Sequence, residues 1–143
     1  MIIPGSCHCG NISFELIWEP DPAEIPARAC GCSFCVKHGG LWTSNPRGAV
    51  KVRLRDPGKV TRYTFGTRTA EFLICSGCGV VPVATSAIDG VVHAVVSVHA
   101  FNGVDPAMLR PGPISFDGEG TDTRLARRKR SWIPSVEIVE GTA

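Results

Sequence analysis

The stretch Cys30-Gly31-Cys32-Ser33-Phe34-Cys35 places three cysteines within six residues. A second group, Cys7-His8-Cys9-Gly10, precedes it in the chain, and a third, Cys75-Ser76-Gly77-Cys78-Gly79, follows it. All seven cysteines of the chain therefore fall into three tight groups. Single buried cysteines that pack in a core have no reason to gather in this way. These groups are the strongest structural signal in the sequence.

The spacing within the groups is typical of metal-ligating cysteines. Residues 32/35 and 75/78 form Cys-x2-Cys pairs, and residues 7/9 and 30/32 form Cys-x-Cys pairs. Such spacing permits a tight turn whose backbone N–H groups point at the sulfurs, and glycine makes the turn easier. Zinc takes four such ligands in a tetrahedron. The odd number of cysteines disfavours disulfides, and a thioredoxin-like redox pair needs a βαβ pattern that the sequence lacks. We therefore predict zinc binding.

Seven cysteines can be divided between metal sites in more than one way. A division into four and three uses every cysteine: Cys7, Cys9, Cys75 and Cys78 in one site, and Cys30, Cys32 and Cys35 in the other. Structural zinc sites are closed, whereas catalytic ones keep an open position, so the first site would be structural and the second catalytic. The competing division is a zinc ribbon of residues 32, 35, 75 and 78, which leaves three cysteines without a role. Spacing alone does not decide between the two.

Composition places the chain among globular proteins of ordinary size. It has 143 residues, 43% hydrophobic and 20% charged, with a net charge of +2, which is too small to indicate nucleic acid as a partner. The most apolar run, residues 91–98, is too short to span a membrane. Met1 to Cys9 lacks the basic and apolar regions of a secretion signal. We expect a cytoplasmic protein, in a compartment where structural disulfides are rare.

Short β-branched runs between glycines and prolines predict a mainly β fold with little helix. The expected strands are residues 11–18, 50–54, 60–65, 70–75, 80–88, 91–100 and 136–139. Asp89-Gly90 between two valine-rich runs predicts a hairpin turn. Short helical segments are expected at residues 33–38, 105–109 and 122–129, the second of them capped by Asp105 with Pro106 at its first position.

The order and spacing of all seven cysteines resemble those of the glutathione-dependent formaldehyde-activating enzyme family, which includes the centromere protein V group. The resemblance runs from about Ser6 to Val80 and more loosely beyond. It implies a single domain over residues 1–143 with a β-tent fold, made of antiparallel sheets pinned by zinc. It also implies the division into four and three cysteines, with the second set holding the reactive zinc.

The family's founding activity implies a carbon–sulfur lyase that works in the direction of synthesis, joining glutathione or a related small thiol to formaldehyde or another small carbonyl compound. A zinc held by Cys30, Cys32 and Cys35 would keep an incoming thiol as a nucleophilic thiolate. The alternative is a non-catalytic, zinc-stabilised binding module that uses the basic cluster at residues 124–130. The members of that cluster are Arg124, Arg127, Arg128, Lys129 and Arg130.

Other side chains near the motifs are candidates for smaller roles. His8 lies inside a cysteine loop, where we expect it to face solvent. His38 and Lys37 follow the three-cysteine group and would lie at the surface or near the open zinc position. Trp42 and Trp132 are expected in the core rather than in a pocket wall.

Overall fold

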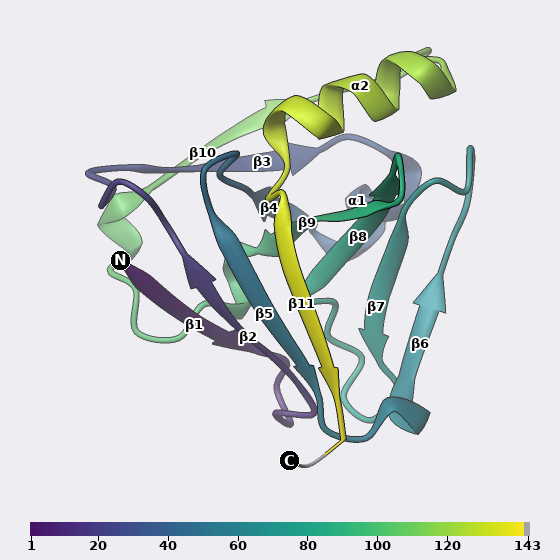
Figure 1. Ribbon diagram of the computed structural model, residues 1–143. Helices are drawn as coiled ribbons and strands as arrows, with labels where there is room; N and C mark the ends of the chain where they lie inside the picture. Colours follow the sequence, from purple (N-terminus) through teal and green to yellow (C-terminus); the bar gives the residue numbers. More distant parts are fainter. Residues whose placement is uncertain (142–143) are drawn as a thin grey trace.

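The protein is described by a computed structural model over residues 1–141, which contain two β-sheets and two α-helices (Figure 1). The strands are β1 (Ile2–Ser6), β2 (Ile12–Ile17), β3 (Ile25–Cys30), β4 (Leu41–Thr43), β5 (Ala49–Leu54), β6 (Val60–Tyr63), β7 (Glu71–Cys75), β8 (Val83–Ile88), β9 (Val91–Ser97), β10 (Leu109–Ile114) and β11 (Ser135–Glu140). The helices are α1 (Ser33–His38) and α2 (Thr121–Ser131), and the 3-10 turns are η1 (Pro57–Lys59), η2 (Val98–Ala100) and η3 (Pro106–Met108). The predicted mainly β fold is confirmed. Residues 142 and 143, the end of the predicted domain, lie outside the described part of the chain.

The strands form a smaller and a larger sheet. The four-stranded sheet has the order β1-β2-β5-β11, and the seven-stranded sheet has the order β10-β3-β4-β9-β8-β7-β6. Most neighbours are antiparallel, but β10 runs parallel to β3 and β11 runs parallel to β5. The sheets are therefore mixed at these edges rather than antiparallel throughout as expected. Parallel neighbours need a long crossover, and here most of the chain separates β3 from β10.

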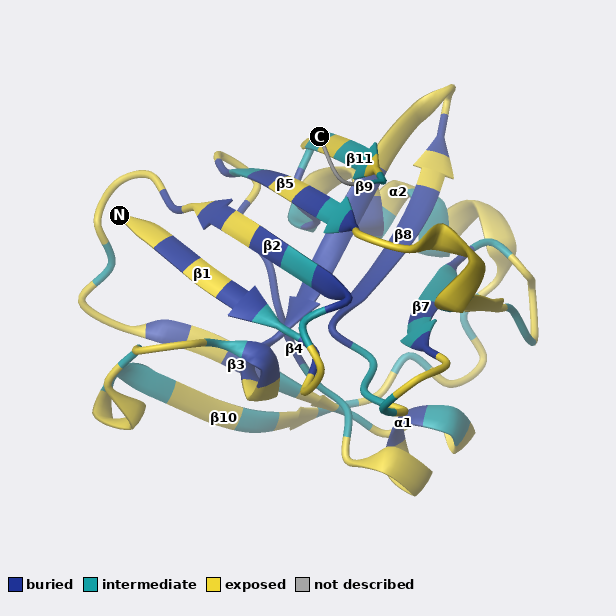
Figure 2. Ribbon diagram, turned by 90° about the horizontal axis from the view of Figure 1, so that it is seen from below, coloured by how far each residue is buried: buried dark blue, intermediate teal, exposed yellow. Residues whose placement is uncertain are grey.

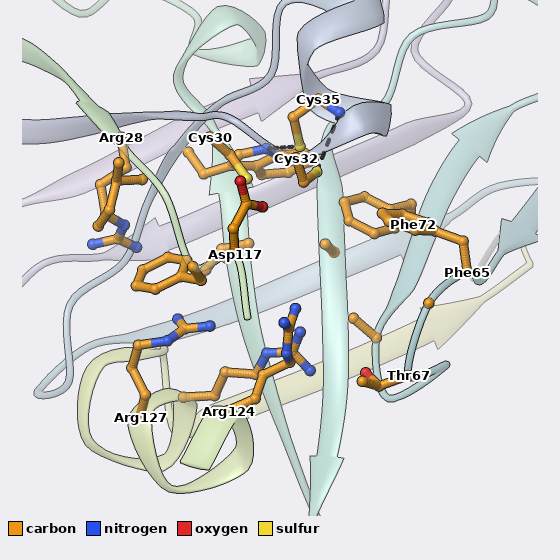
Figure 3. Close-up of a pocket in the computed structure, with 18 of the residues that line it drawn as sticks. Arg28, Cys30, Cys32, Cys35, Phe65, Thr67, Phe72, Asp117, Arg124 and Arg127 are labelled. Atoms are coloured by element: carbon orange, nitrogen blue, oxygen red, sulfur yellow. Dashed lines mark hydrogen bonds between the residues drawn. The ribbon is translucent and has the colours of Figure 1, made fainter. Parts of the chain in front are cut away.

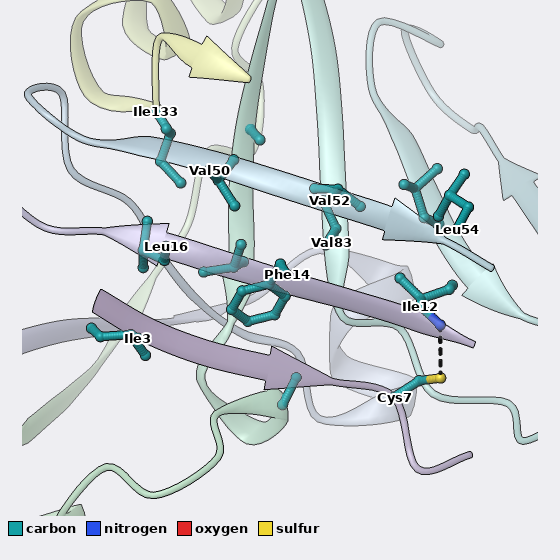
Figure 4. Packing of buried hydrophobic residues seen from close by; sticks show 14 of the residues in the cluster. Ile3, Cys7, Ile12, Phe14, Leu16, Val50, Val52, Leu54, Val83 and Ile133 are labelled. Atoms are coloured by element: carbon teal, nitrogen blue, oxygen red, sulfur yellow. Dashed lines mark hydrogen bonds between the residues drawn. The ribbon is translucent and has the colours of Figure 1, made fainter. Parts of the chain in front are cut away.

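The main core lies between the two sheets (Figure 4). Phe14 and Leu16 of β2 and Val52 of β5 meet Val83 and Val96 from the larger sheet, and all five side chains are buried. In β2 the apolar residues alternate with the wetter Ser13, Glu15 and Ile17, as the sequence predicts for a strand with one solvent-facing side. The burial of alternate residues is visible along β1, β2 and β5 in Figure 2. This burial is the main stabilising contribution to the fold.

Local signals in the sequence correctly place the turn between β8 and β9 and the helical segments α1, η3 and α2, whereas the strand expected over residues 91–100 ends at Ser97 and continues as η2. Asp89 (φ 52°) and Gly90 (φ 79°) both have positive φ and join β8 to β9, as a mirror-image hairpin turn requires. The Asp105 side chain accepts a hydrogen bond from the Ala107 N–H and caps η3. Each of these elements depends on a few adjacent residues, which is why sequence patterns find it.

Four strands have no counterpart among the predicted elements: β1, β3, β4 and β10. Pro4, Pro26, Pro111 and Pro113 interrupt three of them, and β4 is only three residues long. Proline cannot donate a ladder hydrogen bond, so it argues against a central strand. β1 and β10 are edge strands, where one side of the backbone needs no partner, so they accommodate proline.

None of the helices between residues 1 and 141 is long and apolar enough to cross a membrane.

Candidate functional site

A cluster of four cysteines lies where the two sheets meet at one end. Cys7 follows β1 of the smaller sheet, and Cys75 ends β7 of the larger sheet. The four sulfurs of Cys7, Cys9, Cys75 and Cys78 all lie within 4.8 Å of one another. The Cys9 Sγ is 3.4 Å from that of Cys75 and 3.7 Å from that of Cys7. The structure thus brings together the four cysteines of the division into four and three, and not those of the ribbon.

The turns that present these sulfurs depend on glycine. Gly10 (φ 84°) and Gly79 (φ 81°) directly follow the two cysteine pairs in the left-handed region, which side chains with a Cβ disfavour. The Gly79 N–H donates to the Cys75 carbonyl at 2.7 Å and closes the second turn. The Ile12 N–H donates to the Cys7 Sγ at 3.3 Å (Figure 4). The Ile12 N–H thus points at sulfur, as a thiolate ligand requires.

The donor set fits a structural metal ion. Cys7 and Cys75 are buried, whereas Cys9 is exposed. Burial raises the pKa of the Cys7 thiol to about 11, because desolvation disfavours the thiolate, and the neighbouring cysteines act in the same direction. Four sulfurs at these distances can all ionise only if a multivalent cation compensates their charge. The four-cysteine cluster can therefore hold a metal.

A second cluster lies at the junction of β3 and α1. Cys30 ends β3, Cys32 is the N-cap of α1, and Cys35 lies buried on the first turn of that helix. Their three sulfurs also lie within 4.8 Å of one another. The Cys35 N–H donates to the Cys32 Sγ at 3.3 Å, so the capping interaction of the helix orients one sulfur. This cluster can hold a metal with three protein ligands.

Trp42 of β4 supports the second cluster from behind. Its Nε1–H donates to the Cys35 Sγ at 3.4 Å, and the indole is buried. A hydrogen bond from Cys35 lowers the pKa of Cys30 to about 5, and the same pair raises that of Cys35. At neutral pH the cluster therefore carries negative charge, which suits a bound cation.

A cavity of about 440 Å³ opens beside the second cluster (Figure 3). All three of its cysteines line the cavity, so the sulfurs face a space large enough for a small molecule. Phe65 and Phe72 form one aromatic wall. Trp42 and Trp132, expected in the core, are both buried and also line the cavity. A metal ion on this cluster would therefore be within reach of a substrate.

The basic cluster at residues 124–130 does not form one solvated face. Arg124, Arg127 and Arg128 line the cavity, whereas Lys129 pairs with Asp89 at the surface and Arg130 is exposed. The helix turns successive residues in different directions, so a run of basic residues in the sequence divides between pocket and solvent. Figure 3 shows Arg124 and Arg127 across the cavity from the cysteines.

Two charged residues in the cavity were not predicted. Arg28 lies two residues before Cys30 in β3, and the period of a strand puts both side chains on one face, a signal that could have found it. Asp117 lies in a segment that the sequence indicates only as an exposed loop. Figure 3 shows its carboxylate directed toward Cys30 and Cys32.

The residues expected to have smaller roles, His8, Lys37 and His38, do not join either cysteine cluster. His8 and Lys37 are exposed, as expected for loop and helix surfaces. The His38 ring stacks on Phe34 with ring centroids 4.4 Å apart, and burial there lowers the pKa of the imidazole. Neither His8 nor His38 is among the groups whose ligand atoms cluster in residues 1–141.

Comparison with known proteins adds two findings. The sequence model of one protein family, described as glutathione-dependent formaldehyde-activating enzyme, matches residues 2–111. A crystal structure of a Rhodobacter sphaeroides protein, a structural genomics target, is 30% identical in sequence with a TM-score of 0.52. That alignment covers 73% of this chain and 92% of the other. The segment matched by the family model contains all seven cysteines and ends before α2.

Proposed function

Since this chain belongs to the glutathione-dependent formaldehyde-activating enzyme family, we propose that it is a zinc-dependent enzyme that adds a small thiol, such as glutathione, to formaldehyde or another small carbonyl compound. The observation that carries the proposal is the position of the three-cysteine cluster. Its sulfurs lie at the wall of a cavity, whereas the four-cysteine cluster joins the sheets outside it. A site with three protein ligands and access to a pocket has the form of a catalytic zinc site.

In this proposal the two clusters have different metal roles. Cys7, Cys9, Cys75 and Cys78 hold a structural zinc, and Cys30, Cys32 and Cys35 hold a reactive one. Bound zinc supplies a positive charge that keeps a neighbouring thiol in its thiolate form near neutral pH. The aromatic side chains of the cavity lower the local polarity around the reacting groups, which strengthens the electrostatic interactions among them.

The reaction requires one proton to move. A carbon–sulfur bond forms between the thiol sulfur and the carbonyl carbon, and the thiol proton ends on the former carbonyl oxygen. The Asp117 carboxylate lies in the same cavity and is directed toward the cysteines (Figure 3). We assign it the role of accepting the thiol proton and returning it to the oxygen, because a carboxylate beside the reacting groups can serve as base and then as acid.

Exchange spectroscopy tests this function directly. Protein with its zinc content measured is mixed with glutathione and formaldehyde, and the exchange between free and thiol-bound formaldehyde is followed by NMR. We expect acceleration over the uncatalysed rate. No acceleration by fully metal-loaded protein, with glutathione or with other small thiols, would contradict the proposal and favour the non-catalytic binding module.

The role of Asp117 has its own test. Asp117→Asn is expected to lower kcat by about 100-fold, since positioned proton transfer contributes at least that much. Glu15→Gln, on the exposed face of β2, is the matched control and should leave kcat unchanged. Equal rates for wild type and Asp117→Asn would remove the residue from the mechanism but leave the thiol addition itself standing.

A further inference from the structure

Four guanidinium groups line the cavity. Arg124, Arg127 and Arg128 come from α2, with Arg124 and Arg127 across the cavity from the cysteines (Figure 3), and Arg28 comes from β3, two residues before Cys30. We call these four residues the arginine wall. Arg28 is far in the chain from α2, so no local sequence feature explains why it converges with the other three. Converging positive charges in a pocket require either internal counter-ions or an anionic ligand.

Internal counter-ions balance only part of this wall. Glu119 accepts hydrogen bonds from Arg127 Nε and Nη2 at 3.0 and 3.1 Å and lies 3.6 Å from Arg124 Nε. Interaction with Arg127 holds the pKa of the Glu119 carboxyl below its usual range. The carboxylate of Asp117 is directed toward the cysteines rather than toward the arginines (Figure 3). The wall therefore keeps more positive than negative charge.

Among these arginines, the positive charge of Arg128 is the least compensated by nearby carboxylates. Arg128 is only 7% exposed, and among residues 1–141 no carboxylate lies within ion-pair distance of it. Its Nη1 donates to the hydroxyls of Thr69 and Ser86 at 2.8 and 3.2 Å, while its Nε, buried, has no partner within the described residues. A buried charge with only neutral acceptors is costly unless an anion joins it.

Repulsion among the guanidinium charges of the wall also favours an anionic ligand. Burial and, after it, the charges of Arg127 and Arg124 lower the pKa of Arg128 to about 10. Burial also lowers the pKa of Arg28, followed by the effect of Arg127. Both guanidiniums would gain from a negative charge placed between them.

Aromatic rings hold the guanidinium planes in position. The Arg127 guanidinium lies 3.4 Å from the centre of the Phe116 ring, and that of Arg128 lies 4.9 Å from the Trp132 ring. Stacking leaves the edges of a guanidinium free for hydrogen bonds. In Arg127 the edge formed by Nε and Nη2 is occupied by Glu119, which shows that this wall takes a carboxylate through two nitrogens and leaves Nη1 of Arg127 for a ligand.

We propose that Arg28, Arg127 and Arg128 form a carboxylate-binding subsite that selects substrates with an anionic end and directs their other end to Cys30, Cys32 and Cys35. This assignment rests on the proposed function for the identity of the reacting end. The volume of about 440 Å³ accommodates a compact molecule between the two walls. The α2 residues lie beyond the segment matched by the family model, so family membership does not by itself carry the assignment.

Binding measurements test the subsite without relying on turnover. Zinc-loaded full-length protein is titrated with propionate and with propionamide, and then with 3-mercaptopropionate and its amide, with tryptophan fluorescence as the signal. Trp42 and Trp132 both line the cavity and report on its occupancy. We expect each carboxylate to bind about 10- to 100-fold more tightly than its amide, as for hydrogen bonds to charged groups.

Variants of α2 assign the preference to particular side chains. Arg128→Gln is expected to bring the ratio of carboxylate to amide affinity close to one, and Arg128→Lys to retain part of it. Arg130→Gln removes the same charge from the exposed side of the same helix and should keep the full ratio. If Arg128→Gln does not fold, as judged by circular dichroism, Arg127→Gln takes its place, because Arg127 is less deeply buried.

Three results would overturn the subsite. They are equal wild-type affinities for carboxylate and amide, an equal loss of preference in Arg130→Gln, and tight competition by inorganic phosphate, which would make it a phosphate site. Activity measurements then identify which of the two substrates carries the carboxylate. The rate with 3-mercaptopropionate and formaldehyde, where the thiol is the anion, is compared with the rate of a neutral thiol with glyoxylate, where the carbonyl compound is the anion. Carboxylate binding without any thiol addition would leave the subsite standing and refute the proposed function instead, so the two failures are distinguishable.

Discussion

The two cysteine clusters differ in how far apart their cysteines lie in the sequence. Cys9 and Cys75, whose sulfurs are 3.4 Å apart, are separated by 66 positions in the chain and belong to segments that leave different sheets. Cys30, Cys32 and Cys35 all lie within one strand end and the first turn of one helix. The first cluster therefore constrains the arrangement of the two sheets, whereas the second constrains only a local turn.

This difference predicts different consequences for stability and chemistry. A ligand set that joins distant segments contributes its metal-binding free energy to folding, because the unfolded chain does not hold the site together. A local set that borders a cavity can exchange ligands without moving the sheets. The following experiments test that contrast, in order of expected effect.

The largest effect is expected from Cys78→Ala. Loss of one sulfur from the four-cysteine cluster should lower the free energy of unfolding by about 4 kcal/mol or more, as for other losses of a structural metal. Denaturant unfolding followed by circular dichroism measures this change. His8→Ala, in the exposed part of the same region, is the control and should stay near wild type. A fully stable Cys78→Ala protein would show that this cluster does not hold the sheets together.

Cys32→Ser should separate activity from folding. Serine is a favourable N-cap residue and can replace Cys32 as the acceptor for the Cys35 N–H, so α1 should remain intact. The thiol-addition rate is expected to fall by about 1,000-fold, because metal assistance is worth several kcal/mol. NMR exchange measures the loss of activity, and thermal unfolding of the same sample measures whether stability is retained. A variant that unfolds as Cys78→Ala does would erase the contrast between the clusters.

Metal removal should occur in two phases. Chelator is expected to take zinc from the three-cysteine cluster on the order of 100-fold faster than from the four-cysteine cluster, because only the former leaves a coordination position open. A coloured chelator follows release, and circular dichroism follows the fold. The fast phase should abolish activity and leave the spectrum unchanged. Release of both metals at one rate would contradict the assignment of one open and one closed site.

The smallest effect is expected from Trp42→Phe. This change removes the Nε1–H donor to the Cys35 Sγ and should weaken zinc at the three-cysteine cluster by about tenfold, the scale of groups that orient a metal ligand. Competitive chelator titration measures it. Trp132→Phe changes another buried indole of the cavity, one that makes no hydrogen bond to sulfur within residues 1–141, and it should leave zinc affinity unaltered. Equal effects of the two variants would attribute the change to packing.

Sequence reasoning reached the local features of this site and missed those made by distant segments. The turn at Cys30–Cys35, the helix that follows it and the glycines after each cysteine pair depend on adjacent residues, and all are found in the structure. The pocket around them was not foreseen. Asp117 enters it because β10 pairs with β3, and β10 contains two prolines that conceal it as a strand. Pairing between strands as far apart in the sequence as β3 and β10 produces no short-range sequence pattern from which it could be predicted.

The parallel edge strands have one further consequence, for how this protein can diversify. The Gly31 N–H donates to the Ile114 carbonyl at 2.9 Å, so the end of β10 is held beside Cys30, and β11 is held along β5 after α2. The segment between them is anchored at both ends by strand register. Apart from the buried Trp132 and Ile133, its length and side chains can change while both sheets and all seven cysteines stay in place. A transplant of residues 115–131 between relatives should therefore exchange selectivity while the cysteines beside the cavity are inherited unchanged, which makes this segment a route to new substrates in evolution and in engineering.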